Sequence, residues 1–169
     1  RPEDWEGVTM EDGRVVGLYL MWMGLTGAVP PEIGLLTSLR ELQLGENQLT
    51  SLPAEIGQLI SLERLDLGYN QLTSVPVEIG QLTSLKWLVL AGNQLTSVPA
   101  EIGQLITSLE SLCLSYNKLT SLPAEIGQLT SLRQLYLGYN QLTTLPAAIR
   151  ELRAAGCYVH MDDGVTIDE

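Results

Sequence analysis

The side chains best suited to recognising another molecule recur at a fixed spacing in this sequence, beside a repeated Leu-x-Leu core. Tyrosine, tryptophan and arginine dominate the binding energy of protein interfaces. They occur in three columns that vary from repeat to repeat, whereas the spacers between them scarcely change. The columns contain Glu41, Arg64, Trp87, Ser111 and Gln134; Gln43, Asp66, Val89, Cys113 and Tyr136; and Glu46, Tyr69, Gly92, Tyr116 and Tyr139.

These columns predict one partner-binding face. The candidate residues are all members of the columns except Ser111 and Gly92, together with Tyr19 and Trp22 of the preceding segment. We expect the anchors to be Tyr69, Trp87, Tyr116, Tyr136 and Tyr139, and the orienting charges to be Glu41, Arg64 and Asp66. The alternative is that these positions are free to vary after recent duplication, with the aromatic side chains packing on one another.

The residue types in this sequence give little support for catalysis or metal binding. The only histidine is His160, and neither Cys113 nor any serine has a base partner nearby in the sequence. Glycine-rich phosphate-binding motifs are absent. We interpret Asp162, Asp163 and Asp168 as a turn followed by a solvated acidic tail, not as a cation site. The sequence therefore predicts no enzyme activity, no cofactor and no bound metal.

The composition indicates a folded, acidic protein, with 45% hydrophobic residues and a net charge of -11. This charge disfavours nucleic acid, whose phosphates require clustered Lys and Arg. No apolar run approaches the roughly 20 residues that cross a bilayer, and no basic-then-apolar leader precedes the repeats. Cys113 and Cys157 lie in different repeats, too far apart for a disulfide, so we expect free thiols and an intracellular location.

A repeat of about 23 residues organises the chain. Its asparagines are Asn47, Asn70, Asn93, Asn117 and Asn140, at spacings of 23, 23, 24 and 23, and Ile106 is the one extra residue. The units fit L-x-x-L-x-L-x-x-N-x-L, which predicts a short strand with leucines inward and the variable columns outward. We expect the asparagines to form a ladder that satisfies backbone groups where the chain leaves each strand.

The spacers predict short helical turns. Pro53 and its equivalents suit the first helical position, the glutamates two residues later face the positive helix end, and Gly57 and its equivalents should end the turn. Two spacer columns carry hydroxyls: Thr50, Thr73, Thr96, Thr120 and Thr143, and Ser51, Ser74, Ser97, Ser121 and Thr144. We expect these hydroxyls to bond local backbone groups. An ordered ice-binding surface is the alternative.

The sequence divides into one array with a cap at each end. Residues 1–14, which include Trp5, form an N-terminal cap that covers the open apolar end, and residues 15–38 form a degenerate first repeat. Repeats fill residues 39–145. In the C-terminal cap, residues 146–169, we expect a helix from Pro146 to Gly156, a strand over residues 157–161 and a returning edge over residues 165–169.

The repeat units and their PAEIGQL spacers resemble leucine-rich repeats of the 23-residue kind over about residues 15–155. The resemblance implies an α/β solenoid, a right-handed superhelix with a parallel concave β-sheet and short helical or 3-10 turns on the convex side. Most members bind other proteins through the concave face. The opening is similar to plant receptor ectodomains, with Met10 where those carry a cap cysteine. The spacers are also similar to lamprey variable lymphocyte receptors, whose cysteine-rich caps are missing here.

Arrays without disulfide caps resemble intracellular repeat proteins of plants, algae and protists, which we take as the nearest group. The prediction is a non-catalytic module that binds a protein or peptide through the concave face. We expect a monomer, and leave weak self-association open as an alternative. The alternatives are a structural, designed or consensus scaffold without a natural ligand and, less favoured, an ice-binding surface.

Overall fold

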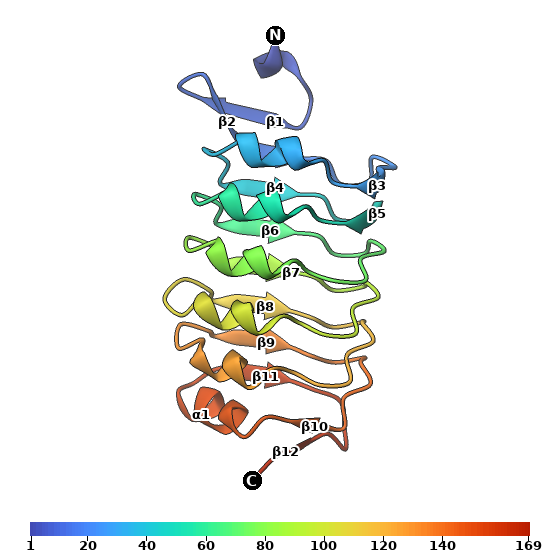
Figure 1. Ribbon diagram of the computed structural model, residues 1–169, viewed down its shortest axis with the longest axis vertical. Helices are drawn as coiled ribbons and strands as arrows, with labels where there is room; N and C mark the ends of the chain where they lie inside the picture. Colours follow the sequence, from blue (N-terminus) through green and yellow to red (C-terminus); the bar gives the residue numbers. More distant parts are fainter.

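One continuous eight-stranded sheet runs the length of the molecule in the computed structural model, which describes all residues 1–169 (Figure 1). The strands follow one another in chain order. They are β1 (Val8–Glu11), β2 (Arg14–Tyr19), β4 (Glu41–Gln43), β6 (Arg64–Asp66), β7 (Trp87–Val89), β8 (Ser111–Cys113), β9 (Gln134–Tyr136) and β11 (Tyr158–His160). All neighbours pair in parallel except β1 and β2, which pair antiparallel. The predicted parallel-sheet solenoid is confirmed.

Each strand is only a few residues long because the alternation of inward-facing leucines and outward-facing residues is limited to its Leu-x-Leu core. The central leucines of successive strands, such as Leu65 and Leu112, are fully buried and lie opposite their equivalents in the next rung. The flanking residues point to the other side of the sheet, as a side-chain period of two requires. The leucines of all rungs join one hydrophobic core of 38 residues, so a rung cannot bury its apolar face without its neighbours.

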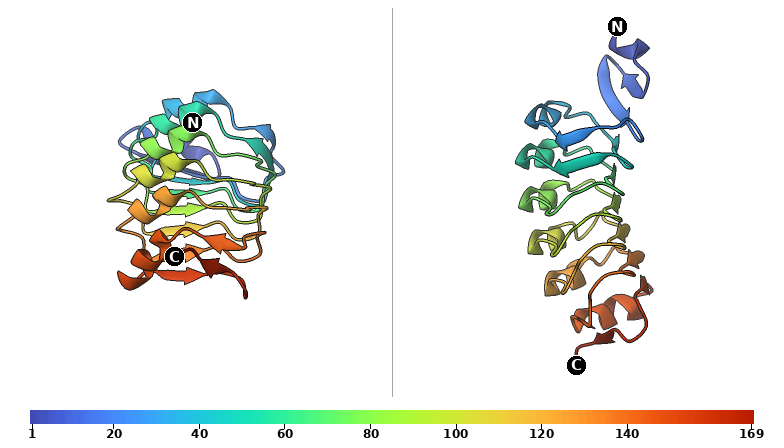
Figure 2. Two further views of the ribbon diagram at one scale, coloured as in Figure 1. Left: turned by 60° about the horizontal axis from the view of Figure 1, so that its bottom comes forward. Right: turned by 90° about the vertical axis from the view of Figure 1, so that its right-hand side faces the viewer.

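Short 3-10 helices stack on the side opposite the sheet, as Figure 2 shows. They are η2 (Pro31–Leu35), η3 (Ala54–Gln58), η4 (Val77–Gln81), η5 (Ala100–Gln104) and η6 (Ala124–Gln128), and η1 (Pro2–Asp4) precedes the array. Two predictions for these turns are wrong in detail. Pro53 lies just before η3, not at its first position, and Gly57 lies inside η3 and does not end it.

Gly57 is required by contact with the next rung. A Cβ atom there would lie 2.9 Å from Glu78 Cβ, closer than real Cβ atoms come, and 3.0 Å from the Glu78 carbonyl oxygen. Gly103 meets Glu125 in the same way. The glycines therefore allow neighbouring 3-10 helices to pack closely.

The asparagines form the predicted ladder. Asn93 Nδ2 donates to the carbonyls of Leu67 and Leu90, both at 3.0 Å, and its Oδ1 accepts from the Leu72 N–H at 3.0 Å. Each such side chain thus bonds its own rung and the preceding one. The other ladder members, Asn47, Asn70, Asn117 and Asn140, repeat this pattern. The ladder satisfies backbone groups that would otherwise be buried without partners.

The extra residue Ile106 lies in a turn after η5, 41% exposed. The strands on either side keep their register, since Trp87 still pairs with Ser111. The insertion is therefore absorbed outside the sheet.

The C-terminal cap contains the structure's only α-helix, α1 (Ala148–Ala154), which begins two residues after Pro146, and Gly156 follows it with a positive φ of 98°. β12 (Thr166–Ile167) returns to pair with β10 (Thr144–Leu145), outside the main sheet. A similar small sheet joins β3 (Thr26–Ala28) and β5 (Gln48–Ser51) at the other end. None of the helices has the length and apolarity needed to cross a membrane.

Asp162 completes the backbone hydrogen bonds at the last rung. Elsewhere the corresponding N–H donates to a carbonyl of the next rung, as Tyr116 does to Gly138 at 3.0 Å. At the end of the array, the Tyr139 N–H donates to the Asp162 carboxylate at 2.8 and 2.9 Å. The carboxylate therefore substitutes for the backbone carbonyl that accepts this hydrogen bond in the other rungs.

Replacing Asp162 with alanine is expected to lower the free energy of unfolding by about 1 kcal/mol, because the Tyr139 N–H then has only water as acceptor. Asp162→Asn keeps an acceptor oxygen and should lose less. Denaturant unfolding measures both. The neighbouring exposed Asp163→Ala is the control and should change stability by under about 0.5 kcal/mol. Equal losses at both positions would contradict the role of Asp162.

The N-terminal cap adds a hairpin to the sheet and leaves Trp5 exposed. This side chain is 63% exposed and does not cover the apolar end. The β1–β2 hairpin extends the sheet instead, and Arg40 holds it by an ion pair to Glu11 at 2.8 Å. An apolar cavity of about 290 Å³, lined by residues such as Leu25 and Ile33, lies at this end.

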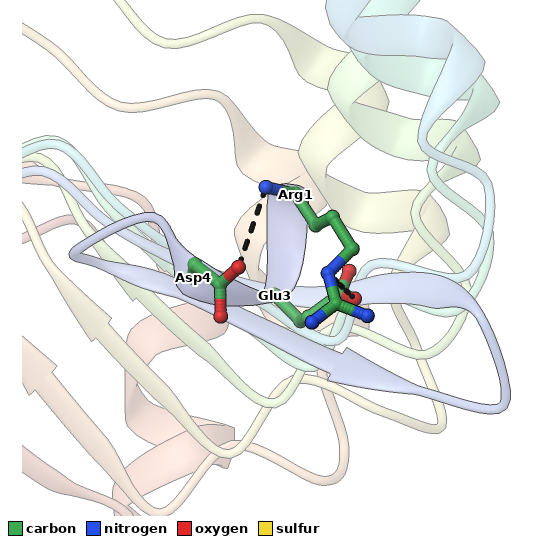
Figure 3. A network of polar contacts seen from close by, with 3 residues as sticks. All are labelled: Arg1, Glu3 and Asp4. Carbon is green, nitrogen blue, oxygen red and sulfur yellow. Dashed lines mark hydrogen bonds and ion pairs between the residues drawn. The ribbon is translucent and has the colours of Figure 1, made fainter.

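Figure 3 shows the polar contacts at the chain start, where Arg1 pairs with Glu3 through its side chain and with Asp4 through its amino group. The separations are 3.5 and 3.3 Å. All three side chains are largely exposed, so these pairs contribute little to stability.

Candidate functional site

The exposed side of the eight-stranded sheet, which we call the concave face, carries the columns predicted from the sequence. Strand pairing places Glu41, Arg64, Trp87, Ser111 and Gln134 opposite one another in succession. A second column begins at Tyr19 and continues through Gln43, Asp66, Val89, Cys113 and Tyr136. Because the sheet is continuous, these side chains form one surface, not separate sites.

Two further residues belong to this surface that the sequence reasoning did not assign to it. Tyr158 pairs with Gln134, and His160 pairs with Tyr136, through β11. The sequence contained a signal for this placement. Tyr158 and His160 each follow their partners by 24 residues, which is also the spacing across the Ile106 insertion. They were missed because the repeat motif has already ended there.

The third column, which we call the outer column, follows each strand where the chain turns away. It contains Trp22, Glu46, Tyr69, Gly92, Tyr116 and Tyr139, all with positive φ between 56° and 68°. A left-handed conformation costs a residue with a side chain roughly 1–2 kcal/mol. The hydrogen bond from each N–H to the next rung, such as Tyr69 to Ala91 at 2.7 Å, holds this conformation.

The tyrosine side chains of the outer column lie against one another or against Gly92. Tyr116 and Tyr139 stack with their ring centroids 4.3 Å apart and their planes at 5°. Tyr69 lies against Gly92, where a side chain would overlap its ring. Nevertheless Tyr69, Tyr116 and Tyr139 remain 50%, 48% and 61% exposed. Their packing therefore fixes the rings but leaves much of their area open to a ligand.

The N-terminal half of the concave face carries the charges. Arg64 lies over the Trp87 ring, 4.7 Å from its centroid, and Lys86 is 5.9 Å from it. Arg64 makes no ion pair, and its Nε is buried without a hydrogen-bond partner. Glu41 accepts hydrogen bonds from the Tyr19 hydroxyl at 3.0 Å and from the Gln43 amide at 3.3 Å. Arg64 thus presents a guanidinium that is held by stacking and lacks an acidic partner.

Two tyrosines of the concave face, Tyr19 and Tyr116, have raised pKa values. Desolvation raises the pKa of Tyr116 above its ordinary value, and the neighbouring Tyr139, Tyr69 and Asp162 raise it further. Burial and the hydrogen bond to Glu41 also raise the pKa of Tyr19. In both cases the folded protein favours the neutral phenol.

The stability of the protein should therefore fall as pH rises above about 10. In that range the unfolded chain releases the tyrosine protons while the folded protein retains them, so proton loss favours unfolding. Tyr116→Phe should make this fall shallower. Denaturant unfolding between about pH 9 and 11 measures the slopes. Identical slopes for the native protein and Tyr116→Phe would contradict the raised Tyr116 pKa.

The remaining reactive residues are dispersed. Cys113 lies on the concave face, and Cys157 is buried; both thiols are free, and burial raises the pKa of Cys157. No group of three or more His, Cys, Asp or Glu side chains could hold a metal ion. Asp162 is engaged with the Tyr139 N–H.

The two Ser/Thr columns behave differently from the prediction. All ten residues are exposed. The only serine or threonine side chains with a hydrogen bond are Ser38 and Thr130, which are outside these columns. The expected bonds to local backbone groups are therefore absent, and the regular rows of hydroxyls are open to solvent.

The fold and this surface define the class of protein: a solenoid that displays columns of variable side chains on a parallel sheet. A model of a leucine-rich repeat region matches residues 24–118, and a model of two leucine-rich repeats matches residues 107–151. The chain belongs to the leucine-rich repeat family. No curated protein is significantly similar to it in sequence.

Several solved structures are similar to this chain. A leucine-rich repeat protein of Leptospira interrogans is 39% identical over 86% of this chain and 42% of its own, with a TM-score of 0.63. The ectodomain of the Arabidopsis receptor kinase HAESA, solved with an N-terminally extended IDA peptide hormone, is 32% identical over 98% of this chain, with a TM-score of 0.84. This chain covers 29% of the HAESA chain.

A plant ice-binding protein is also similar, with 29% identity over 98% of this chain and 55% of its own, and a TM-score of 0.77. This chain thus spans less than two thirds of the length of each of these three proteins.

Proposed function

We propose that this protein is a non-catalytic module that binds a protein or peptide through its concave face. The observation that carries this proposal is the outer column, where three fixed tyrosine rings remain about half exposed beside the strand columns. Aromatic side chains held in place before binding lose little entropy when a ligand arrives. HAESA, which shares this fold, was solved with a peptide hormone, and this supports a peptide or protein as the class of ligand.

The charged half of the concave face would set the orientation of the ligand. Arg64 lacks an ion-pair partner within the protein, so an acidic group of the ligand can approach it without breaking an internal pair. Its place on Trp87 restricts the guanidinium to one arrangement. Glu41 lies opposite Arg64 in the strand register, and Asp66 lies two residues further along the Arg64 strand. Both carboxylates would disfavour an acidic ligand group in their own positions.

The test is affinity capture from a lysate of the source organism, read by mass spectrometry, with three baits. The first is the native protein, the second carries Tyr69→Ser, Trp87→Ser and Tyr136→Ser, and the third carries Gln71→Ser, Gln94→Ser and Gln141→Ser at exposed positions outside the concave face. Circular dichroism and unfolding must first show that all three are folded. Partners retained by the third bait and lost by the second support the proposal; equal recovery by all three contradicts it.

A second candidate function, ice binding, rests on the exposed hydroxyl columns and the similarity to a plant ice-binding protein. Rungs at about 4.8 Å place the hydroxyls in a regular array, and none of them is occupied by a backbone bond. Thermal hysteresis of the native protein tests this candidate. Thr96→Lys with Thr120→Lys should abolish the effect, whereas Tyr116→Ser should leave it unchanged. No hysteresis in the native protein excludes it.

A further inference from the structure

The first rung of the solenoid, which contains β2, β3 and η2, buries its apolar side chains only in part. Leu18, Leu25 and Ile33 are half-buried and pack against the hydrophobic core from outside it. Their equivalents in the next rung, which are almost fully buried, are Leu42, Leu49 and Ile56. The hydrophobic core is therefore incomplete at its N-terminal end.

The N-terminal cap covers only the sheet side of this rung. β1 pairs with β2 and so continues the sheet. In the right-hand view of Figure 2, no element stacks on η2 at this end, whereas η3 packs between η2 and η4. The helix side of the first rung thus lacks the neighbour that covers it in the other rungs.

The apolar cavity of about 290 Å³ lies at this incomplete end. Its wall combines side chains of β2, β3, β4, β5 and η2, so both the sheet side and the helix side of the rung contribute to it. Thr26 is the only polar side chain of the wall, and no charged side chain takes part. The cavity is therefore a hollow walled almost entirely by aliphatic groups.

This wall determines the polarity of an occupant. An ordered water needs about two to four polar partners, which a single threonine hydroxyl does not supply. A charged ligand would lose its hydration without gaining an opposite charge, and the net charge of -11 disfavours an anion further. An uncharged aliphatic molecule gains from leaving water and loses no hydrogen bond.

The volume of the cavity determines the size of an occupant. It is about twice that of an apolar cavity of about 150 Å³ that holds benzene, and a water-sized group takes about 30 Å³, so there is room for about ten such groups. One turn of a helix, about 10 Å across and about 5.4 Å long, is larger than this. The cavity therefore suits a small molecule better than an inserted helix.

We propose that this cavity binds a small, uncharged aliphatic molecule of about ten non-hydrogen atoms, such as a medium-chain alcohol. The molecule completes the hydrophobic core where the hairpin leaves it open. Thr26 is exposed at the edge of the wall, and its hydroxyl can pair with one polar group of the ligand. This inference goes beyond the proposed function, because the cavity lies inside the first rung and not on the concave face.

Isothermal titration calorimetry with octanol tests the inference. The ligand controls are octanoate and the octane diol with a hydroxyl at each end. Octanol should bind at least about tenfold more tightly than either control, because the controls bring a charge or a second hydroxyl against the aliphatic wall. Failure of octanol to bind, or equal binding of octanol and octanoate, overturns the inference.

Matched substitutions locate the site. Ile33→Trp adds a large apolar side chain to the wall and should weaken octanol binding by at least about tenfold. Ile60→Trp makes the same change at an exposed position outside the cavity and should bind octanol as the native protein does. Ala28→Leu is a smaller addition to the wall that serves if Ile33→Trp does not fold. Equal octanol binding by the native protein and a folded cavity-filling variant overturns the inference.

Light scattering distinguishes a small ligand from a second copy of the chain. The native protein should be a monomer with and without octanol. A dimer that binds no octanol and that Ile33→Trp dissociates would place the cavity in an interface and overturn the inference. The triple variant of the concave face with Tyr69→Ser, Trp87→Ser and Tyr136→Ser should still bind octanol, so this inference and the proposed function can fail separately.

Discussion

Replacing Asn93 with alanine is expected to lower the free energy of unfolding by about 3–5 kcal/mol. The Asn93 side chain is only 6% exposed and bonds the Leu67 and Leu90 carbonyls and the Leu72 N–H. Its loss leaves the Leu72 N–H buried without an acceptor, which costs about 1–3 kcal/mol. It also removes one hydrogen bond, worth about 0.5–1.5 kcal/mol, from each of the Leu67 and Leu90 carbonyls, which keep their bonds from Asn70 and Asn117. Denaturant unfolding followed by circular dichroism measures the change.

Interrupting the asparagine ladder at Asn93 should also make unfolding less cooperative, because each rung of a solenoid is stabilised by its neighbours. We expect a broader transition in Asn93→Ala, with the rungs on one side of the substitution unfolding before those on the other. Gln94→Ala, at the adjacent exposed position, is the control and should change stability by under about 0.5 kcal/mol. A loss below about 1 kcal/mol in Asn93→Ala would contradict the structural role of the ladder.

Replacing Trp87 with alanine is expected to weaken binding of a concave-face ligand about 30-fold or more. Trp87 lies beside the charged residues of the concave face, where Arg64 stacks on its ring. The substitution removes a large contact area and also releases Arg64 from its fixed arrangement. A loss of about 2 kcal/mol, the usual threshold for an interface hot spot, corresponds to this factor.

Isothermal titration with a ligand selected by the native protein measures the Trp87 effect. Arg64→Ala and the double variant complete a double-mutant cycle, and we expect coupling because the two side chains are in contact. Trp87 is partly buried, so unfolding of each variant must be measured alongside binding. Unchanged affinity in a folded Trp87→Ala protein would show that the ligand does not contact this part of the concave face.

The sequence predicted the solenoid and its concave columns because the leucine period determines both the strands and which side chains face outward. The backbone role of the asparagines followed from their position at the strand ends. Gly57 was assigned wrongly because a local rule for helix ends was applied to a residue whose role depends on Glu78 in the next rung. Contacts between rungs are not visible in a single repeat.

The left-handed outer column and the open N-terminal end were missed for different reasons. Gly92 is of a residue type that favours a positive φ, but the tyrosines at the equivalent positions of the other repeats obscured this signal. The N-terminal cap has no repeat to compare with, so the exposure of Trp5 could not be derived from the period. Tyr158 and His160 were missed because they lie beyond the last motif.

Nuclear magnetic resonance mapping of a peptide selected from a random library tests the central claim most directly. The chemical shifts of the isotope-labelled protein are compared with and without the peptide. If the concave face binds the ligand, the largest shifts will cluster on β6 to β9 and on the outer column from Tyr69 to Tyr139. Shifts clustered on the 3-10 helices or on the Ser/Thr columns, with the concave face unchanged, would contradict the account.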